Sequence, residues 1–92
     1  EPFWNITTAN GEAQFSTPDS QSEWTAGQME WARGSMNAFI IRLKKGDAPG
    51  QITAFRTGNA CSDGMSDTAF PFHGVLTGPD GSVYSGCCQR GG

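Results

Sequence analysis

Short runs in which hydrophobic and polar residues alternate recur along the chain, and turn-forming residues separate them. The clearest run spans residues 37–44, where Phe39, Ile41 and Leu43 share one face and polar residues such as Arg42 share the other. Alternation with a period of two is typical of a strand that buries one face. The pattern therefore predicts an antiparallel sheet with one apolar face.

Turn chemistry marks where the predicted strands begin and end. Asn10-Gly11 is a hairpin signal, the stretch 58–67 reads as a loop, and Pro71 predicts an edge strand or a bulge because proline lacks a ladder donor. A short helix is an alternative for residues 22–33. The predicted strands are 3–8, 13–16, 23–25, 28–33, 37–44, 51–57, 70–77 and 82–89. About seven or eight short strands predict one all-β domain over residues 1–92, an antiparallel meander forming a small barrel or sandwich.

The composition supports a small, turn-rich domain with an aromatic core. The chain has 92 residues, of which 36% are hydrophobic and 16% charged, with thirteen glycines and five prolines. Such a chain has a thin core that a covalent link would stabilise. Three tryptophans and six phenylalanines supply much of the core volume. Trp24 is the expected exception, an exposed binding residue, because polar residues surround it in the sequence.

The net charge argues against nucleic acid as a partner, and the hydropathy argues against a transmembrane segment. Six basic and nine acidic residues give a net charge of −3, whereas nucleic-acid binding needs a basic surface. No stretch approaches the roughly 20 apolar residues of a transmembrane segment. The chain starts at Glu1 rather than at a methionine, which suggests processing and leaves room for a signal peptide or a lipid anchor upstream.

Three cysteines, Cys61, Cys87 and Cys88, favour one disulfide over a metal site. A C-x-x-C motif is absent and His73 is the single histidine, so neither structural zinc nor another cofactor is expected. Adjacent side chains of a strand point to opposite faces, so one of Cys87 and Cys88 can pair with Cys61 while the other stays free. Spacing leaves the choice between them open.

Three segments together resemble a family of bacterial envelope proteins of unknown function that are often described as lipoproteins. They are the opening Glu1-Pro2-Phe3-Trp4, the stretch Cys61-Ser62-Asp63-Gly64-Met65-Ser66-Asp67 and the late Gly86-Cys87. Members of this family sometimes occur beside META/HslJ-like domains, and the resemblance covers nearly the whole chain. It implies an envelope location, a disulfide between Cys61 and Cys87, and Cys88 as the free thiol, but no activity.

The stretch from Cys61 to Asp67 and the lone histidine are the candidate binding residues. Asp63, Ser66 and Asp67 present carboxylates and a hydroxyl that a ligand can contact, although such side chains equally stabilise tight turns. His73 is a candidate contact residue on the surface. As an alternative it is the base that activates Cys88 or Cys61 in a thiol-dependent enzyme or redox protein.

These observations lead to an expected function rather than a defined activity. We expect an exported, periplasmic or envelope-associated binding module that is not an enzyme and that contacts an envelope protein or a glycan. A lysozyme-inhibitor-like role is one concrete form, by analogy of size and compartment. The alternatives are a structural accessory domain of a larger lipoprotein and, less favoured, the thiol-dependent protein.

Overall fold

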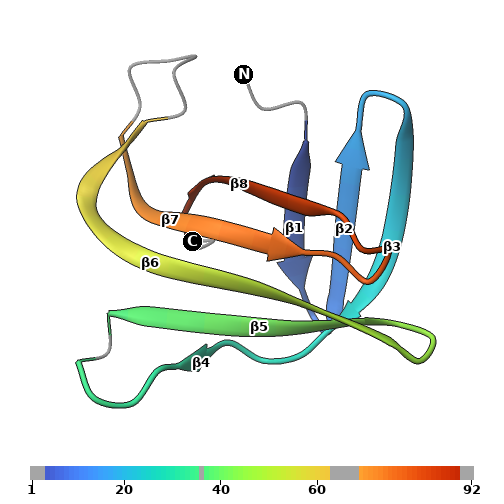
Figure 1. Ribbon diagram of the computed structural model, residues 1–92, viewed down its shortest axis with the longest axis horizontal. Coiled ribbons are helices and arrows are strands. Elements are labelled where there is room, and N and C mark those ends of the chain that lie inside the picture. The colour runs from blue at the N-terminus through green and yellow to red at the C-terminus, as the bar shows by residue number, and fades with distance from the viewer. Residues whose placement is uncertain (1–3, 36, 63–68, 90–92) are drawn as a thin grey trace.

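The computed structural model describes residues 4–35, 37–62 and 69–89, and within them leaves out the side chains of residues 59, 60, 62 and 69. These residues form one antiparallel sheet, which confirms the predicted all-β class (Figure 1). Its strands are β1 (Asn5–Ala9), β2 (Glu12–Thr17), β3 (Ser20–Ala26), β4 (Glu30–Trp31), β5 (Ala38–Lys45), β6 (Ala48–Ser62), β7 (Ala69–Thr77) and β8 (Val83–Cys88). Segment 22–33 therefore forms strands and not the helix that was its alternative.

The sheet is a meander that curls into a half-barrel. Its strand order is β1-β2-β3-β5-β6-β7-β8, and the short β4 pairs with β5 beside this path. β3 contacts β5 through two ladder positions, Thr25↔Lys44 and Ala26↔Leu43. Figure 1 shows β1–β3 running across the direction of β5–β8. One curled sheet, and not two stacked ones, therefore supports the barrel alternative over the sandwich.

The inner face of the half-barrel holds an aromatic core. Phe15 stacks on Trp24 with ring centroids 5.0 Å apart, and Phe39 packs edge-on against Phe72 at 5.2 Å. Large aromatic rings let a few residues fill a thin core. The buried hydrophobic residues are Ala13, Phe15, Trp24, Phe39, Ile41, Leu43, Ala54, Phe72 and Leu76.

Side-chain packing brings the two ends of the sheet together. Along the described ladder β1 and β8 are end strands, with β2 and β7 as their partners. The Trp4 ring nevertheless lies 5.5 Å from the Tyr84 ring of β8 and 6.5 Å from the Phe15 ring of β2. Contacts between aromatic rings therefore cover the core where no backbone ladder between β1 and β8 is described.

The Asn10-Gly11 hairpin forms as the sequence predicts. Asn10 has a φ of 55° and Gly11 a φ of 82°, and the flanking residues Ala9 and Glu12 pair. Positive φ at both turn residues defines the type I′ turn, which asparagine and glycine adopt most readily. Because the turn twist matches the strand twist, this local signal sets the register of β1 against β2.

The predicted loop at 58–67 is wrong in its first half, because β6 continues to Ser62. The β6–β7 register jumps from Arg56↔Phe72 to Cys61↔Phe70, so residues 57–60 bulge opposite Pro71. Proline has no backbone N–H for the ladder, and bulges are where a sheet accommodates it. Thr57 Oγ1 instead donates to the Phe70 carbonyl at 3.0 Å. The bulge alternative for Pro71 is thus confirmed.

Gly50 lies where β6 passes the turn between β7 and β8, and alanine there is expected to destabilise the fold. A Cβ at Gly50 would lie 2.7 Å from both the Thr77 carbonyl oxygen and Pro79 Cδ. Overpacking against backbone costs about 1–3 kcal/mol, so we expect urea unfolding of Gly50→Ala at a lower midpoint. Gly27→Ala is the control, since its Cβ meets the Arg42 carbonyl oxygen at an ordinary 3.7 Å. Equal midpoints for the two variants would contradict the close approach.

Candidate functional site

Trp24, expected to be exposed, is a core residue with 3% of its surface accessible, so that expectation is wrong. Its sequence neighbours Glu23 and Thr25 are exposed on the opposite side of β3. Because side chains alternate along a strand, the polar neighbours of Trp24 point outward while Trp24 itself faces inward. The Trp24 Nε1–H has no hydrogen-bond partner among the described residues. Trp24 therefore contributes to the core rather than to a surface site.

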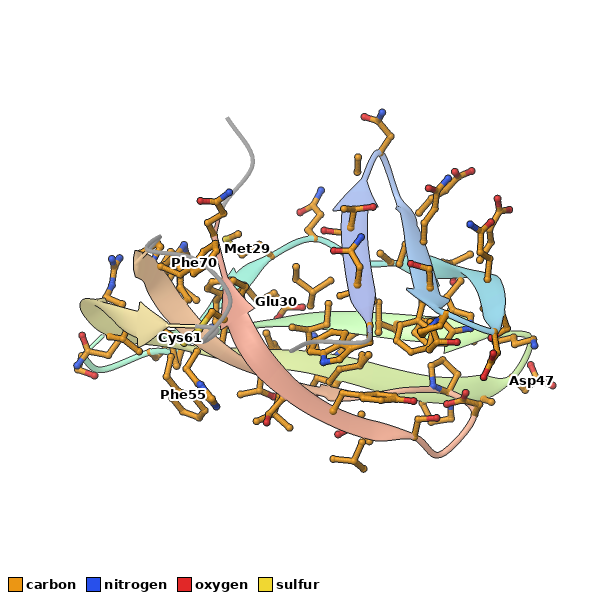
Figure 2. All side chains as sticks on the ribbon, turned by 90° about the horizontal axis from the view of Figure 1, so that it is seen from above. Met29, Glu30, Asp47, Phe55, Cys61 and Phe70 are labelled. Carbon is orange, nitrogen blue, oxygen red and sulfur yellow. A yellow bond between two sulfur atoms is a disulfide. The ribbon has the colours of Figure 1, made fainter. Side chains whose placement is uncertain are left out.

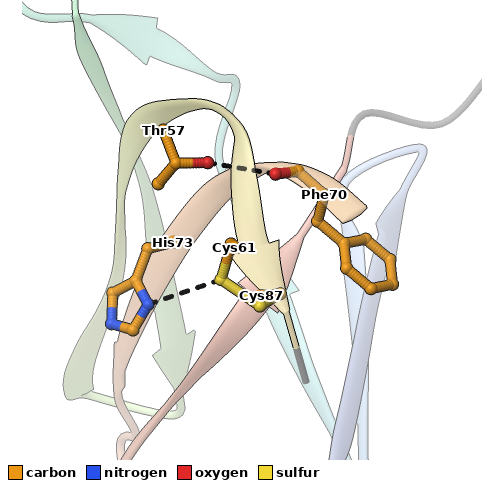
Figure 3. Close-up of a disulfide and its surroundings, with 5 residues drawn as sticks. All are labelled: Thr57, Cys61, Phe70, His73 and Cys87. Carbon is orange, nitrogen blue, oxygen red and sulfur yellow. Dashed lines mark hydrogen bonds between the residues drawn. A yellow bond between two sulfur atoms is a disulfide. The ribbon is translucent and has the colours of Figure 1, made fainter. Parts of the chain in front are cut away.

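Three other candidate binding residues, Asp63, Ser66 and Asp67, lie outside the described residues. The described candidates of this region are Cys61, His73 and Cys87. These three side chains meet on the outer face of the half-barrel, at the end of the β6–β7–β8 segment (Figure 3).

The disulfide joins Cys61 to Cys87, with the two Cα atoms 5.7 Å apart. β7 lies between β6 and β8, and strands two ladder steps apart are about 10 Å apart in a flat sheet. The bulge at 57–60 lets the end of β6 arch over β7, so that Cys61 reaches β8 (Figure 3). The pairing that the family resemblance implies is therefore the pairing in the structure.

His73 is exposed and lies against the disulfide. On the ladder it stands between Phe55 of β6 and Cys87 of β8, and its Nδ1 is 3.6 Å from the Sγ of Cys61. A disulfide sulfur carries no hydrogen, so in this hydrogen bond the Nδ1–H of the imidazole is the donor. The contact is to Cys61 rather than to Cys87, which makes the two sulfur atoms chemically unequal.

A surface of mixed apolar and polar side chains lies on the outer face of β6–β8, with Thr53, Thr77 and Ser85 between its apolar positions. We call it the outer patch and define it by Phe55, His73, Val75, Val83 and the disulfide. Phe55 is 49% exposed and Val83 67% exposed, the two large hydrophobic side chains that stand out on the described surface. Figure 2 shows Phe55 projecting from the side of β5–β8 that lies away from β1–β3.

Strand alternation explains why the outer patch exists. Phe55 follows the fully buried Ala54 on β6, and Val75 lies between the buried Gly74 and Leu76 on β7. These strands bury their inner face against the core, while their outer face carries further apolar residues. Phe55 was within a predicted strand, but its exposure depends on which face the curled sheet turns inward.

The inner face also carries a cation whose position could not be predicted from the sequence. The Arg56 guanidinium lies 4.6 Å from the Trp31 ring centroid and 5.6 Å from that of Phe72. Stacking of this kind stabilises a cation on an aromatic face by about 0.5–1 kcal/mol at an exposed site. Arg56 therefore helps to cover the Trp31 and Phe72 rings of the aromatic core.

A shallow cleft of about 460 Å³ lies between the β1–β2 turn and the segment that follows β3. Its volume falls in the range of small-molecule sites. Its lining carries no charged side chain and consists of Thr8, Ala9, Asn10, Gly11, Ala26, Gly27, Gln28, Met29 and Ile41. Backbone and small side chains dominate this lining, so the cleft offers few convergent groups for fixing a ligand.

Cys88 is the free cysteine, and it faces away from His73. Its Sγ is 3.0 Å from the Cβ position of an alanine built at Gly74, which places the thiol on the inner face. Burial away from water raises the pKa of the Cys88 thiol above its ordinary value, because desolvation disfavours the thiolate. The pairing of Cys88 with His73 needed for a thiol-dependent enzyme is therefore not formed.

We expect Cys88 to react slowly with iodoacetamide while the protein is folded. A raised pKa keeps the thiol protonated near pH 7, and the half-burial of Cys88 restricts access. Intact mass should show one adduct after denaturation without reductant and three after reduction. In the folded protein, the rate of alkylation should rise at a higher pH than the rate for an unburied cysteine thiol. Rapid native alkylation at pH 7 would contradict this placement.

Comparison of the chain with protein-family models, curated proteins and solved structures finds no match. Across the described residues no group of three or more His, Cys, Asp or Glu side chains is arranged to hold a metal ion. In the same part of the chain no helix is long and apolar enough to cross a membrane. The family resemblance remains a prediction, and inference about function depends on the geometry above.

Proposed function

We propose that this chain is a non-catalytic binding module of an exported, envelope-associated protein and that it contacts a protein partner through the outer patch. The observation that carries the proposal is Phe55, an aromatic side chain of β6 that is 49% exposed. Aromatic residues are enriched among those that dominate binding energy at protein interfaces. Ladder pairing with Ala38 and His73 fixes the backbone of Phe55, so little backbone conformational entropy is lost on binding.

The surroundings of Phe55 support a protein partner over a small ligand. Val75 and Val83 add apolar positions on the same face, and the exposed polar His73 stands between Phe55 and Cys87. Protein interfaces combine apolar and polar groups. The cleft beside the β1–β2 turn lacks such a combination, which makes it the weaker candidate.

The export part of the proposal rests on the disulfide. Disulfides persist in oxidising compartments such as the periplasm and are rare in a reducing cytosol. The Cys61–Cys87 bond is therefore what an exported domain is expected to contain. The resemblance to envelope proteins points to the same compartment.

A glycan is the second candidate partner, because an exposed aromatic face such as that of Phe55 can also stack on a sugar ring. Protein and glycan partners differ in their sensitivity to protease. Treating an envelope extract with protease before binding removes a protein partner and leaves a glycan partner. A lysozyme-inhibitor-like role is a specific form of the protein alternative, and it predicts retention of purified lysozyme.

We expect Phe55→Asp to reduce the amount of partner retained from envelope extract by at least tenfold. Losing one central aromatic contact typically costs about 2 kcal/mol or more, and a buried unpaired carboxylate adds to that cost. Gln14→Asp, on an exposed position of β2, is the matched control and should retain the partner. Equal retention by Phe55→Asp and the unaltered chain would exclude the outer patch as the binding surface.

A further inference from the structure

We propose that the Cys61–Cys87 disulfide is a thiol–disulfide exchange site at which an attacking thiolate is directed to Cys87 and Cys61 is the leaving group. The reductant is a dithiol, either a small molecule or the active site of a disulfide reductase. This inference does not require that the outer patch binds a partner, although the disulfide and His73 belong to both sites, because it needs only access of a thiolate to one sulfur atom.

The asymmetry of the hydrogen bonding gives the exchange its direction. The Nδ1 of His73 is 3.6 Å from the Sγ of Cys61, and the imidazole is the donor in this contact. When the disulfide breaks at Cys87, that same N–H faces the thiolate that forms on Cys61. Exchange is faster when the leaving thiolate is better stabilised, so attack at Cys87 is favoured over attack at Cys61.

Access to the site is consistent with exchange. Cys61 and Cys87 are half-buried on the outer face, and His73 beside them is exposed. Cys88 cannot be the attacking group, because it lies on the inner face of the same strand and its pKa is raised by burial. The attacking thiolate must therefore come from outside the chain.

The reaction balances in two steps. One thiolate of the dithiol attacks Cys87 Sγ, the disulfide bond breaks, and Cys61 leaves as a thiolate that takes up the proton released by the dithiol. The second thiol of the reductant, as a thiolate, then attacks the reductant's first sulfur, which is bonded to Cys87 in the mixed disulfide. This attack releases Cys87 as a thiolate, which is then protonated. Two electrons pass from the dithiol to the protein, and the reductant ends as an internal disulfide.

Opening the bond has a local structural consequence. Beyond the bulge at 57–60, the end of β6 is held to β7 by two described ladder positions, Cys61↔Phe70 and Ser62↔Ala69. The disulfide adds a covalent link from this short segment to β8 (Figure 3). Reduction removes that link and leaves the two ladder positions to hold the end of β6 beyond the bulge, whereas six ladder positions from Gln51 to Arg56 hold the rest of the strand to β7.

The position of the first adduct tests the proposal directly. The full chain is incubated with reduced glutathione, quenched with acid, digested and mapped by mass spectrometry. We expect glutathione on Cys87 to exceed that on Cys61 by about tenfold. In His73→Ala we expect this preference to be lost and opening by dithiothreitol to slow about five- to tenfold. Equal adducts on the two cysteines of the unaltered chain, or an unchanged preference in His73→Ala, would overturn the proposal.

Two further variants separate hydrogen bonding from a general effect of mutation. His73→Asn places an amide N–H near the position of Nδ1 and is expected to keep part of the preference for Cys87. Ser85→Ala, an exposed position of β8 two residues from Cys87, should leave both rate and preference unchanged. If Ser85→Ala slowed opening as much as His73→Ala, the assignment of a specific role to His73 would be wrong.

Discussion

Replacing Phe15 with alanine is expected to lower the free energy of unfolding by about 3–5 kcal/mol. Phe15 is 4% exposed, and its ring lies within 5.0–6.5 Å of the rings of Trp24, Tyr84 and Trp4. It therefore joins β2 to β3, to β8 and to the segment before β1. Removing it leaves a cavity among large rings that cannot all move inward, and the lost contacts add to the lost apolar burial.

Urea unfolding followed by tryptophan fluorescence measures this effect. Gln14→Ala is the matched control, because Gln14 is exposed on the opposite face of β2 and its loss should change stability by less than about 0.5 kcal/mol. A Phe15→Ala protein as stable as Gln14→Ala would show that the aromatic cluster does not link the strands.

Removing both cysteines of the disulfide, as Cys61→Ala with Cys87→Ala, is expected to cost about 2–5 kcal/mol. The bond closes a sequence separation of 26 residues, for which loop-closure entropy alone contributes roughly 3.5 kcal/mol. For a chain of 92 residues this is a large part of the total stability. The double variant leaves no unpaired thiol at either position, so exchange does not complicate the unfolding curve.

Cys88→Ala is the matched control for the double variant. Cys88 is half-buried and free, so its replacement removes one sulfur atom from the inner face and is expected to cost about 1 kcal/mol. Thermal unfolding monitored by circular dichroism compares the two. If the double variant lost no more stability than Cys88→Ala, the disulfide would be a reactive site without a stabilising role.

Several elements of the fold were predictable from local sequence. The alternating run at 37–44 corresponds to β5 (Ala38–Lys45), and Asn10-Gly11 forms the hairpin that it predicts. These predictions succeeded because alternation and turn preference act between neighbours in the chain. The bulge opposite Pro71 was also predictable from local sequence, since proline itself lacks the backbone N–H that a ladder position needs.

The errors arose where local composition was used to infer exposure. Trp24 was expected to be exposed because its neighbours are polar, although alternation along β3 buries it. Residues 58–62 were predicted as the first part of a loop over 58–67, yet they extend β6 through the bulge. In both places the pairing of strands overrode the character of individual residues.

The sequence by itself determined the all-β class, most strand positions, that one of Cys87 and Cys88 stays free, and the tight hairpin, because these follow largely from residues that are adjacent or nearly so. The tertiary structure decided the curl of the sheet, the contact of His73 with Cys61 and the row of Phe55, His73 and Cys87 on the outer face. These features depend on the register between strands, and a shift of one residue would turn every side chain to the other face. Unlike the register of the β1–β2 hairpin, the register of these strands depends on packing of the whole aromatic core, which no local stretch of sequence contains.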